Sequence, residues 1–210
     1  MIRILIVDDH AVVRHGLKNI LSEQPDMSVM GEAGNAGQLM DILGTGDWDI
    51  LIMDISMPGK SGLDILRQLR HDHPRLPVLL LSMLPEEQFA VRALQAGASG
   101  YMTKDTAPEE LVKAVRKIFA GGRYISPSLA EKLADQLGAP GEQLPHEKLS
   151  EREFQVFLKI ASGEPLTKIG EELYLSVKTV TTYRSRVLEK MGMQSNAELI
   201  RYGIEHKLTE

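Results

Sequence analysis

The chain has 210 residues, of which 43% are hydrophobic, and a formal net charge of −5. This length suits one or two globular domains with buried cores. The absence of cysteine excludes disulfides and thiolate metal sites, and no apolar run is long enough to span a membrane. The N-terminal run MIRILIVDDH lacks the cleavage site of a secretory signal. We therefore expect a cytoplasmic protein with no membrane partner.

The first 121 residues alternate short β-rich runs with stretches of helical spacing. The runs expected to form strands span Ile2–Val7, Met27–Ala33, Ile50–Met53, Val78–Leu81 and Gly100–Thr103. Helical spacing of apolar residues is found over residues 10–21, 62–69, 85–96 and 108–120. Strands that alternate with helices predict a parallel sheet covered on both faces, which is a doubly wound α/β fold.

Residues 122–148 interrupt this alternation. They are rich in glycine and proline, with one stretch of helical spacing in SLAEKLADQL, and are interpreted as a linker that contains a short helix. From residue 149 to 210 the pattern is helical with short breaks. The sequence therefore predicts an α/β domain over 1–121 and a second, all-α domain over 149–210.

Polar side chains stand at the carboxyl ends of four predicted strands. They are Asp8 and Asp9 after the first strand, Asp54 after the third, Ser82 after the fourth and Lys104 after the fifth. Ligands bind beyond these ends in an open parallel sheet. Three carboxylates repel one another unless a cation lies between them, and Mg²⁺ suits oxygen ligands and phosphoryl oxygens. Each residue alone fits an ordinary strand end, but the five together predict a phosphoryl-binding pocket.

The motifs VDDH, MDISMPGKSG, LLLS and GYMTKD occur in this order and resemble the receiver domain of two-component response regulators. That family has a flavodoxin-like (βα)5 fold. The resemblance implies that Asp54 accepts a phosphoryl group from the phosphohistidine of a sensor histidine kinase. It implies that Lys104 holds a phosphoryl oxygen and that Ser82 and Tyr101 form the switch. The alternative for Tyr101 is an aromatic side chain packed at the sheet edge.

The same resemblance implies a set of Mg²⁺ ligands around the phosphoacceptor. Asp9, Asp54 and the main-chain carbonyl of Ser56 would bind the ion directly, and Asp8 would act through water. Pro58 and Gly59 would shape the loop that follows Asp54.

The segment Ser176–Gly192 has the pattern of a helix with one apolar face and one small polar face. The polar face holds Lys178, Thr181, Thr182 and Ser185, and a flank holds Thr179, Arg186 and Lys190. Ser176 suits the N-cap, and LTKIGEEL upstream completes a helix-turn-helix. The preceding helix begins with the capping-box residues Ser150 and Glu153. Such a helix fits a DNA major groove, although a bundle for protein contacts gives a similar pattern.

The segment LSEREFQVFLKIASGEPLTKIGEELYLSVKTVTTYRSRVLEKMGM resembles the LuxR/NarL/FixJ-type DNA-binding domain, with the GacA/UvrY branch as its nearest likeness. The resemblance implies base contacts by Thr181, Thr182 and Ser185. The backbone contacts that it implies come from Lys178, Thr179, Tyr183, Arg186 and Lys190. Many members have lysine at the positions of Thr181 and Ser185, so base preference is not transferable. Arg184 is predicted to be structural and paired with an acid.

The two resemblances together identify the chain as a member of the response regulators that act as transcription factors. Phosphorylation of Asp54 is expected to control dimerisation and sequence-specific binding to double-stranded DNA, since such domains usually bind two half-sites as dimers. One alternative is a receiver whose helical domain binds protein or RNA. Another is an aspartyl-phosphate phosphatase, but that chemistry usually needs a second aspartate where this chain has Ser56. We expect no turnover enzyme.

Histidines are not expected to form a metal site. His71 and His73 are two residues apart, which does not place them on one helical face, and His10, His15, His146 and His206 lack the mutual spacing of zinc ligands.

Overall fold

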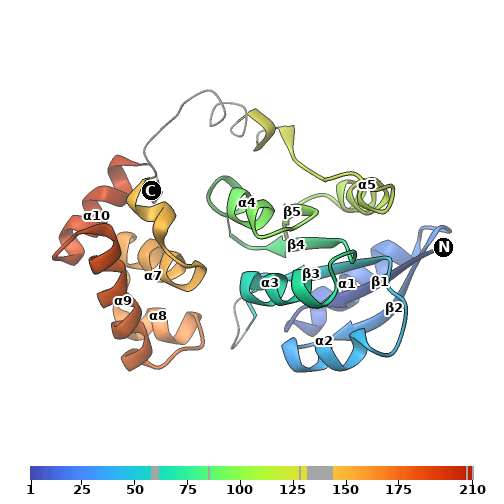
Figure 1. Ribbon diagram of the computed structural model, residues 1–210, viewed down its shortest axis with the longest axis horizontal. Coiled ribbons are helices and arrows are strands. Elements are labelled where there is room, and N and C mark those ends of the chain that lie inside the picture. The colour runs from blue at the N-terminus through green and yellow to red at the C-terminus, as the bar shows by residue number, and fades with distance from the viewer. Residues whose placement is uncertain (58–61, 85, 128, 132–143, 207, 210) are drawn as a thin grey trace. The chain divides into compact units, whose positions relative to one another are not determined.

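The computed structural model describes residues 1–57, 62–84, 86–127, 129–131, 144–206 and 208–209 (Figure 1). The chain divides into two compact units, Met1–Asp135 and Gln136–Glu210. Pro58, Gly59 and most of the helical stretch predicted in SLAEKLADQL lie outside the described residues.

The first unit is built on a five-stranded parallel sheet, which confirms the predicted fold. The strands are β1 (Ile2–Val7), β2 (Met27–Ala33), β3 (Ile50–Asp54), β4 (Val78–Ser82) and β5 (Gly100–Thr103), in the order β2-β1-β3-β4-β5. Every residue of β3 and β4 is buried, as their uninterrupted apolar runs predict. Both strands extend one residue further than predicted and end on Asp54 and Ser82 themselves.

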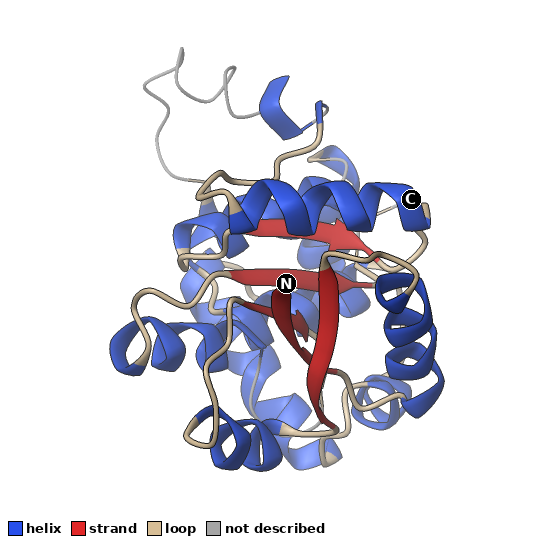
Figure 2. Ribbon diagram, turned by 90° about the vertical axis from the view of Figure 1, so that its right-hand side faces the viewer, coloured by secondary structure: helices blue, strands red, loops and turns tan. Residues whose placement is uncertain are grey.

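Helices lie on both sides of this sheet (Figure 2). They are α1 (Ala11–Ser22), α2 (Ala36–Leu43), α3 (Gly62–Asp72), α4 (Glu86–Gln95) and α5 (Pro108–Phe119). Alternate residues of β1 and β3, such as Ile4 and Ile52, pack with Leu21 of α1 and Val115 of α5 in one buried cluster. This packing fixes the strands as rigid supports for the residues at their carboxyl ends.

The strand order places the site-bearing ends side by side. The order of the strands reverses at β1, because β2 lies on one side of it and β3 on the other, while all strands remain parallel. Val7 pairs with Met53, so Asp8 follows β1 next to the position where Asp54 ends β3. Ligands of doubly wound sheets bind at such a reversal point.

The first part of the predicted linker packs on the first unit, and its last part packs on the second unit. Tyr124 forms a β-bridge with Gly100 and its hydroxyl donates to Glu110 Oε2 at 3.2 Å. Residues 145–148 form a short 3-10 helix, η1 (Pro145–Lys148), in which His146 Nδ1 lies 2.8 Å from the Tyr202 hydroxyl. The division between the two compact units, at residues 135 and 136, falls inside this segment.

The second unit contains the helices α7 (Glu151–Ala161), α8 (Leu166–Glu172), α9 (Val177–Met191) and α10 (Asn196–Glu205). The predicted capping residues form their bonds: Ser150 N donates to Glu153 Oε2 at 2.7 Å, and Ser176 Oγ accepts from Thr179 N at 3.1 Å. Helix α9 ends at Met191 and is capped by Gly192, whose φ of 67° is left-handed and favours glycine. Helices α8 and α9 are thus the two helices of a helix-turn-helix.

None of the helices in the described part of the chain combines the length and the hydropathy needed to cross a bilayer.

Candidate functional site

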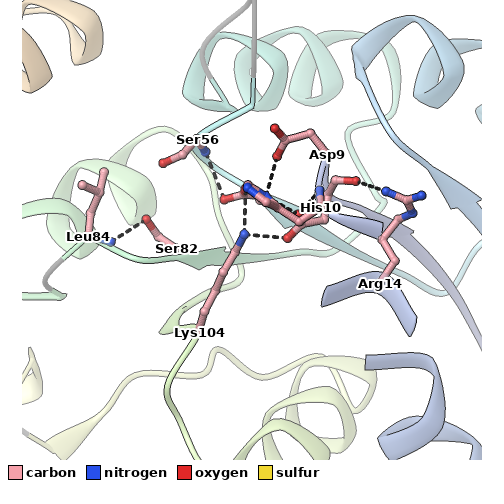
Figure 3. Close-up of polar contacts among 9 residues, drawn as sticks. Asp9, His10, Arg14, Ser56, Ser82, Leu84 and Lys104 are labelled. Atoms are coloured by element: carbon pink, nitrogen blue, oxygen red, sulfur yellow. Dashed lines mark hydrogen bonds and ion pairs between the residues drawn. The ribbon is translucent and has the colours of Figure 1, made fainter. Parts of the chain in front are cut away.

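The side chains predicted at the strand ends converge at one edge of the sheet. Lys104 Nζ lies 2.8 Å from Asp54 Oδ2 and 2.6 Å from Asp8 Oδ2 (Figure 3). Both carboxylates are almost fully buried, with 1% of Asp8 and 2% of Asp54 exposed. Ser56 N donates to the other oxygen of Asp54 at 3.0 Å. The structure therefore holds one ammonium between two buried carboxylates. The turn that follows β3 fixes the Asp54 side chain through the N–H of Ser56.

Burial and pairing act in opposite directions on the charges of this site. Burial raises the pKa of the Asp54 carboxyl, and the bonds from Lys104 and Ser56 offset that rise only in part. Burial lowers the pKa of Lys104, but the carboxylates of Asp54 and Asp8 outweigh this effect and the net direction is upward. The pairing thus favours the charged form of Lys104, while the charged form of Asp54 is only partly compensated and would be favoured by a further cation.

Ser82 and Tyr101 are joined through the backbone of one residue. Leu84 N donates to Ser82 Oγ at 3.0 Å (Figure 3). The Tyr101 hydroxyl donates to Leu84 O at 2.8 Å. Both side chains are fully buried. Because Ser82 Oγ only accepts in this contact, its hydrogen remains available for another acceptor, and a displacement of Leu84 would act on Tyr101 directly.

Two residues that the sequence analysis did not place in the pocket also belong to it. His10 Nδ1 lies 3.2 Å from Asp8 Oδ1 and 3.0 Å from Asp9 Oδ1. Arg14 donates to the carbonyl of Asp8 at 2.6 Å. His10 directly follows the two aspartates, and this adjacency is the signal that a search for paired histidines missed.

The donor set of the pocket fits a hard divalent cation. Ligand atoms of Asp8, Asp9, His10 and Asp54 all lie within 4.8 Å of one another. Asp9 Oδ1 is buried and makes no hydrogen bond among the described residues, although His10 Nδ1 lies 3.0 Å away. A buried carboxylate oxygen without a donor is costly, and a cation bound to oxygen ligands removes that cost.

The predicted polar face of α9 is exposed, but its hydroxyl groups bond back to the helix. Thr181 Oγ1, Thr182 Oγ1 and Ser185 Oγ donate to carbonyls one turn earlier, at 2.9, 3.0 and 3.1 Å. Their hydrogens are engaged, so these side chains present acceptor lone pairs and, for the threonines, methyl groups. Lys178 and Arg186 are exposed, and no ion pair involves either within the described parts of the chain.

Two basic residues of α9 are bonded inside the helical unit. Arg184 Nε donates to Asn196 Oδ1 at 2.5 Å, so its predicted structural place is correct but the predicted acidic partner is wrong. Lys190 Nζ lies 2.6 Å from Oε2 of Glu153, which is 3% exposed. Burial raises the pKa of Glu153, but its bonds with Lys190 and Ser150 bring it below the usual range.

Replacing Lys190 with methionine is expected to destabilise the second unit by about 1–3 kcal/mol at pH 7, because it leaves buried Glu153 without its cation. A lowered carboxyl pKa contributes stability above the unfolded pKa, and that stability is lost as pH falls through the folded pKa. The deficit should therefore shrink below about pH 4. Urea unfolding of the full chain measures it, with exposed Lys178→Met as the matched control. Equal stability of both variants would leave Lys190 free for DNA.

Two family models match the chain. The response regulator receiver domain matches residues 4–116, and the luxR family of bacterial regulatory proteins matches residues 147–203. Response regulator GacA from Pseudomonas aeruginosa is 39% identical over 211 residues, covering 100% of this chain and 99% of that protein. Response regulator UvrY from Escherichia coli K12 is 36% identical over 209 residues, covering 99% of this chain and 96% of that protein.

Solved structures give a consistent result. RcsB from Salmonella enterica serovar Typhimurium, bound to the promoter rprA in the presence of phosphomimetic BeF3−, aligns with a TM-score of 0.63 at 28% identity, covering 96% of this chain and 98% of that one. The response regulator ChrA of a heme-sensing two-component system aligns with a TM-score of 0.53 at 30% identity, covering 99% and 98%.

These matches decide between the alternatives that the sequence left open for the helical unit. A luxR-family domain follows the receiver, and relatives matched over nearly their full length are response regulators, which favours a transcription factor over a protein- or RNA-binding output. The chain belongs to the two-component response regulators whose receiver domain is joined to a luxR-family DNA-binding domain.

Proposed function

We propose that this response regulator accepts a phosphoryl group on Asp54 and that the phosphorylated form binds DNA as a homodimer. The observation that carries the proposal is the position of Lys104, whose ammonium lies between the buried carboxylates of Asp54 and Asp8 at 2.8 and 2.6 Å. A fixed cation beside a nucleophilic carboxylate is what phosphoryl transfer requires, because charge develops on the transferred oxygens.

The donor is a phosphohistidine of a sensor histidine kinase. A carboxylate oxygen of Asp54 forms a bond to phosphorus as the bond from phosphorus to the donor nitrogen breaks, and that nitrogen keeps the electron pair. Lys104 then neutralises a phosphoryl oxygen. The proposed Mg²⁺ ligands are Asp9, Asp54 and the Ser56 carbonyl, with Asp8 acting through water. When bound, the ion supplies a second positive charge for the phosphoryl oxygens.

Ser82 and Tyr101 would carry the change away from Asp54. The free hydrogen of the Ser82 hydroxyl can donate to a phosphoryl oxygen, which pulls on the backbone of Leu84 through the 3.0 Å contact. Leu84 O also accepts from Tyr101 at 2.8 Å, so the same displacement changes the hydrogen bond that holds the ring. A new charge on Asp54 would thereby change hydrogen bonds at the end of β4 and in β5.

The output would be α9 in the major groove of double-stranded DNA. Thr181, Thr182 and Ser185 are the proposed base contacts, and their acceptor lone pairs and methyl groups suit amino groups of adenine or cytosine and the thymine methyl. The remaining proposed contacts are to the DNA backbone, by Lys178, Thr179, Tyr183 and Arg186. Lys190 is a weaker candidate for such a contact, because its ammonium is bonded to Glu153. RcsB, a solved relative, is bound to a promoter with a phosphomimetic present.

The proposed division of labour follows the domains. The receiver spans 1–121, the linker 122–148 and the DNA-binding domain 149–210. The chain accepts the phosphoryl group and loses it slowly, so it acts as a switch and not as a turnover enzyme. A regulator that binds chromosomal DNA works in the cytoplasm.

Incubation with acetyl phosphate and Mg²⁺ tests the acceptor. We expect one acid-stable but hydroxylamine-sensitive phosphoryl group per chain, mapped to Asp54 by peptide mass spectrometry, and no labelling after chelation of the metal. Labelling at another residue, or continued release of phosphate from the donor at a constant rate far above the loss of label, would contradict the proposal.

A further inference from the structure

The first part of the linker is bonded to the first unit at two places. Tyr124 pairs with Gly100 in a β-bridge, and its hydroxyl donates to Glu110 Oε2 at 3.2 Å. Two residues later, the Ser126 hydroxyl donates to Glu86 Oε2 at 2.7 Å. The linker is therefore attached to β5 and α5 through Tyr124, and to the first residue of α4 through Ser126.

The same Ser126 hydroxyl caps a helical turn of the linker. Its oxygen accepts from Leu129 N at 3.1 Å, and the carbonyl of Ser126 accepts from Ala130 N at 3.0 Å. The Leu129 side chain is buried. A serine that caps a helical turn uses only an acceptor lone pair for that bond, and here its hydrogen is given to Glu86. One hydroxyl thus joins the start of this turn to the start of α4.

Glu86 lies two residues after Leu84, whose backbone joins the two switch side chains. A displacement of Leu84 towards Asp54 also moves the first residue of α4, because each residue of chain between them spans at most about 3.6 Å. The contacts of Tyr124, by contrast, are with β5 and α5. A hydrogen bond of normal length is lost when its atoms separate by about 1 Å more. A shift of α4 by that distance relative to α5 therefore breaks the bond between Ser126 and Glu86 and leaves the contacts of Tyr124 in place.

We propose that the bond between Ser126 and Glu86 is a latch that holds the start of the linker on the receiver, and that phosphorylation of Asp54 opens it. The inference rests on the proposed function, because the displacement of Leu84 that opens the latch is the one that a phosphoryl group on Asp54 would cause. Opening releases the turn after Ser126, while the chain stays attached at Tyr124. A longer free segment then connects the helical unit, which extends the reach of two such units towards two half-sites.

Hydrogen–deuterium exchange of the full chain, followed by NMR at the amides of Leu129 and Ala130, tests the latch. Glu86→Ala is expected to speed their exchange by about 10-fold without phosphorylation, the effect of losing one hydrogen bond to a charged group. Beryllofluoride should speed it by a similar factor in the wild type and add little in Glu86→Ala. Glu109→Ala is the matched control, since Glu109 is an exposed carboxylate in the first turn of α5, and it should behave as the wild type.

An exchanged pair separates the contact itself from what each single substitution does to folding. Ser126→Asp keeps a capping oxygen for Leu129 N but sets a second carboxylate against Glu86, so it should also speed exchange. Glu86→Gln/Ser126→Asp restores a donor opposite an acceptor and should return exchange to the slow rate of the wild type. Slow exchange in Glu86→Ala, or fast exchange in the double variant, would overturn the latch.

The response to beryllofluoride distinguishes failure of the latch from failure of the proposed function. A change of exchange at the Leu84 amide of the wild type, with none at Leu129 and Ala130, would overturn the latch alone and leave the role of Asp54 intact. No change at any of the three amides, together with DNA affinity that beryllofluoride does not alter, would overturn both.

Discussion

Replacing Lys104 with methionine is expected to slow phosphorylation of Asp54 by about 10²–10³-fold, the usual cost of removing one preorganised donor from a transition state. The ammonium is 9% exposed and contacts Asp54 and Asp8 at 2.8 and 2.6 Å, so water replaces it poorly. The rate of labelling by acetyl phosphate in saturating Mg²⁺ measures the loss.

The same substitution should change how stability depends on pH. Without Lys104, the buried carboxylates of Asp8 and Asp54 face each other with no cation, and the already raised pKa of Asp54 rises further. A raised carboxyl pKa means that the folded chain binds more protons than the unfolded chain. The free energy of unfolding in metal-free buffer should therefore fall as pH rises from about 4 towards neutrality, more steeply than in the wild type.

Lys113→Met is the matched control, because Lys113 also contacts one carboxylate, Glu110, at 2.7 Å but is 67% exposed. It should retain the labelling rate and nearly all of the stability, because an exposed ion pair contributes little. Equal labelling by Lys104→Met and Lys113→Met would contradict the role assigned to Lys104.

The double substitution Thr181→Ala/Ser185→Ala is expected to weaken binding to a specific DNA site by about 10–100-fold, since each good base contact is worth about 1–3 kcal/mol and these two are single-atom contacts. Alanine is a better helix former than either residue, so α9 should remain folded. Affinity for unrelated DNA and its salt dependence should stay the same, because no phosphate contact is removed. Fluorescence anisotropy with specific and scrambled duplexes measures both.

A second pair of hydroxyl residues in the same unit serves as the control. Ser162 and Thr167 are exposed, and the Ser162 hydroxyl donates to a carbonyl one turn back at 3.0 Å, as those of α9 do. Ser162→Ala/Thr167→Ala should leave both affinities unchanged. Equal weakening on specific and scrambled DNA by the α9 variant would mean that Thr181 and Ser185 contact the backbone and not base edges.

The strands could be predicted from the sequence almost to the residue, because continuous apolar runs such as ILIM have no other place than a sheet buried on both faces. The position of Asp54 followed from the same rule. Helix α2 (Ala36–Leu43) could not be located in the same way, since it spans eight residues, includes Gly37 and shows little more than one turn of apolar spacing.

The hydrogen-bond and ion-pair partners of the side chains were harder to predict than the positions of the residues in the fold. Lys190 lies on the predicted basic flank of α9, but the structure bonds it to Glu153, a contact between residues 37 positions apart that no local pattern shows. Thr181 and Ser185 were predicted to contact bases, and no sequence pattern showed that their hydroxyls donate to carbonyls one turn back in their own helix. The turn between β1 and α1 places His10 next to Asp8. The spacing of histidines in zinc sites does not predict such a contact.

The affinity of the full chain for a specific duplex, with and without beryllofluoride, tests the central claim most directly when wild type and Asp54→Asn are compared and oligomeric state is followed by light scattering. Beryllofluoride mimics the phosphoryl group on a carboxylate, and asparagine has no anionic oxygen to hold it. The account predicts tighter binding and a dimer for the wild type with beryllofluoride, and no response for Asp54→Asn. Equal responses of the two chains, or no response of the wild type, would contradict control of DNA binding through Asp54.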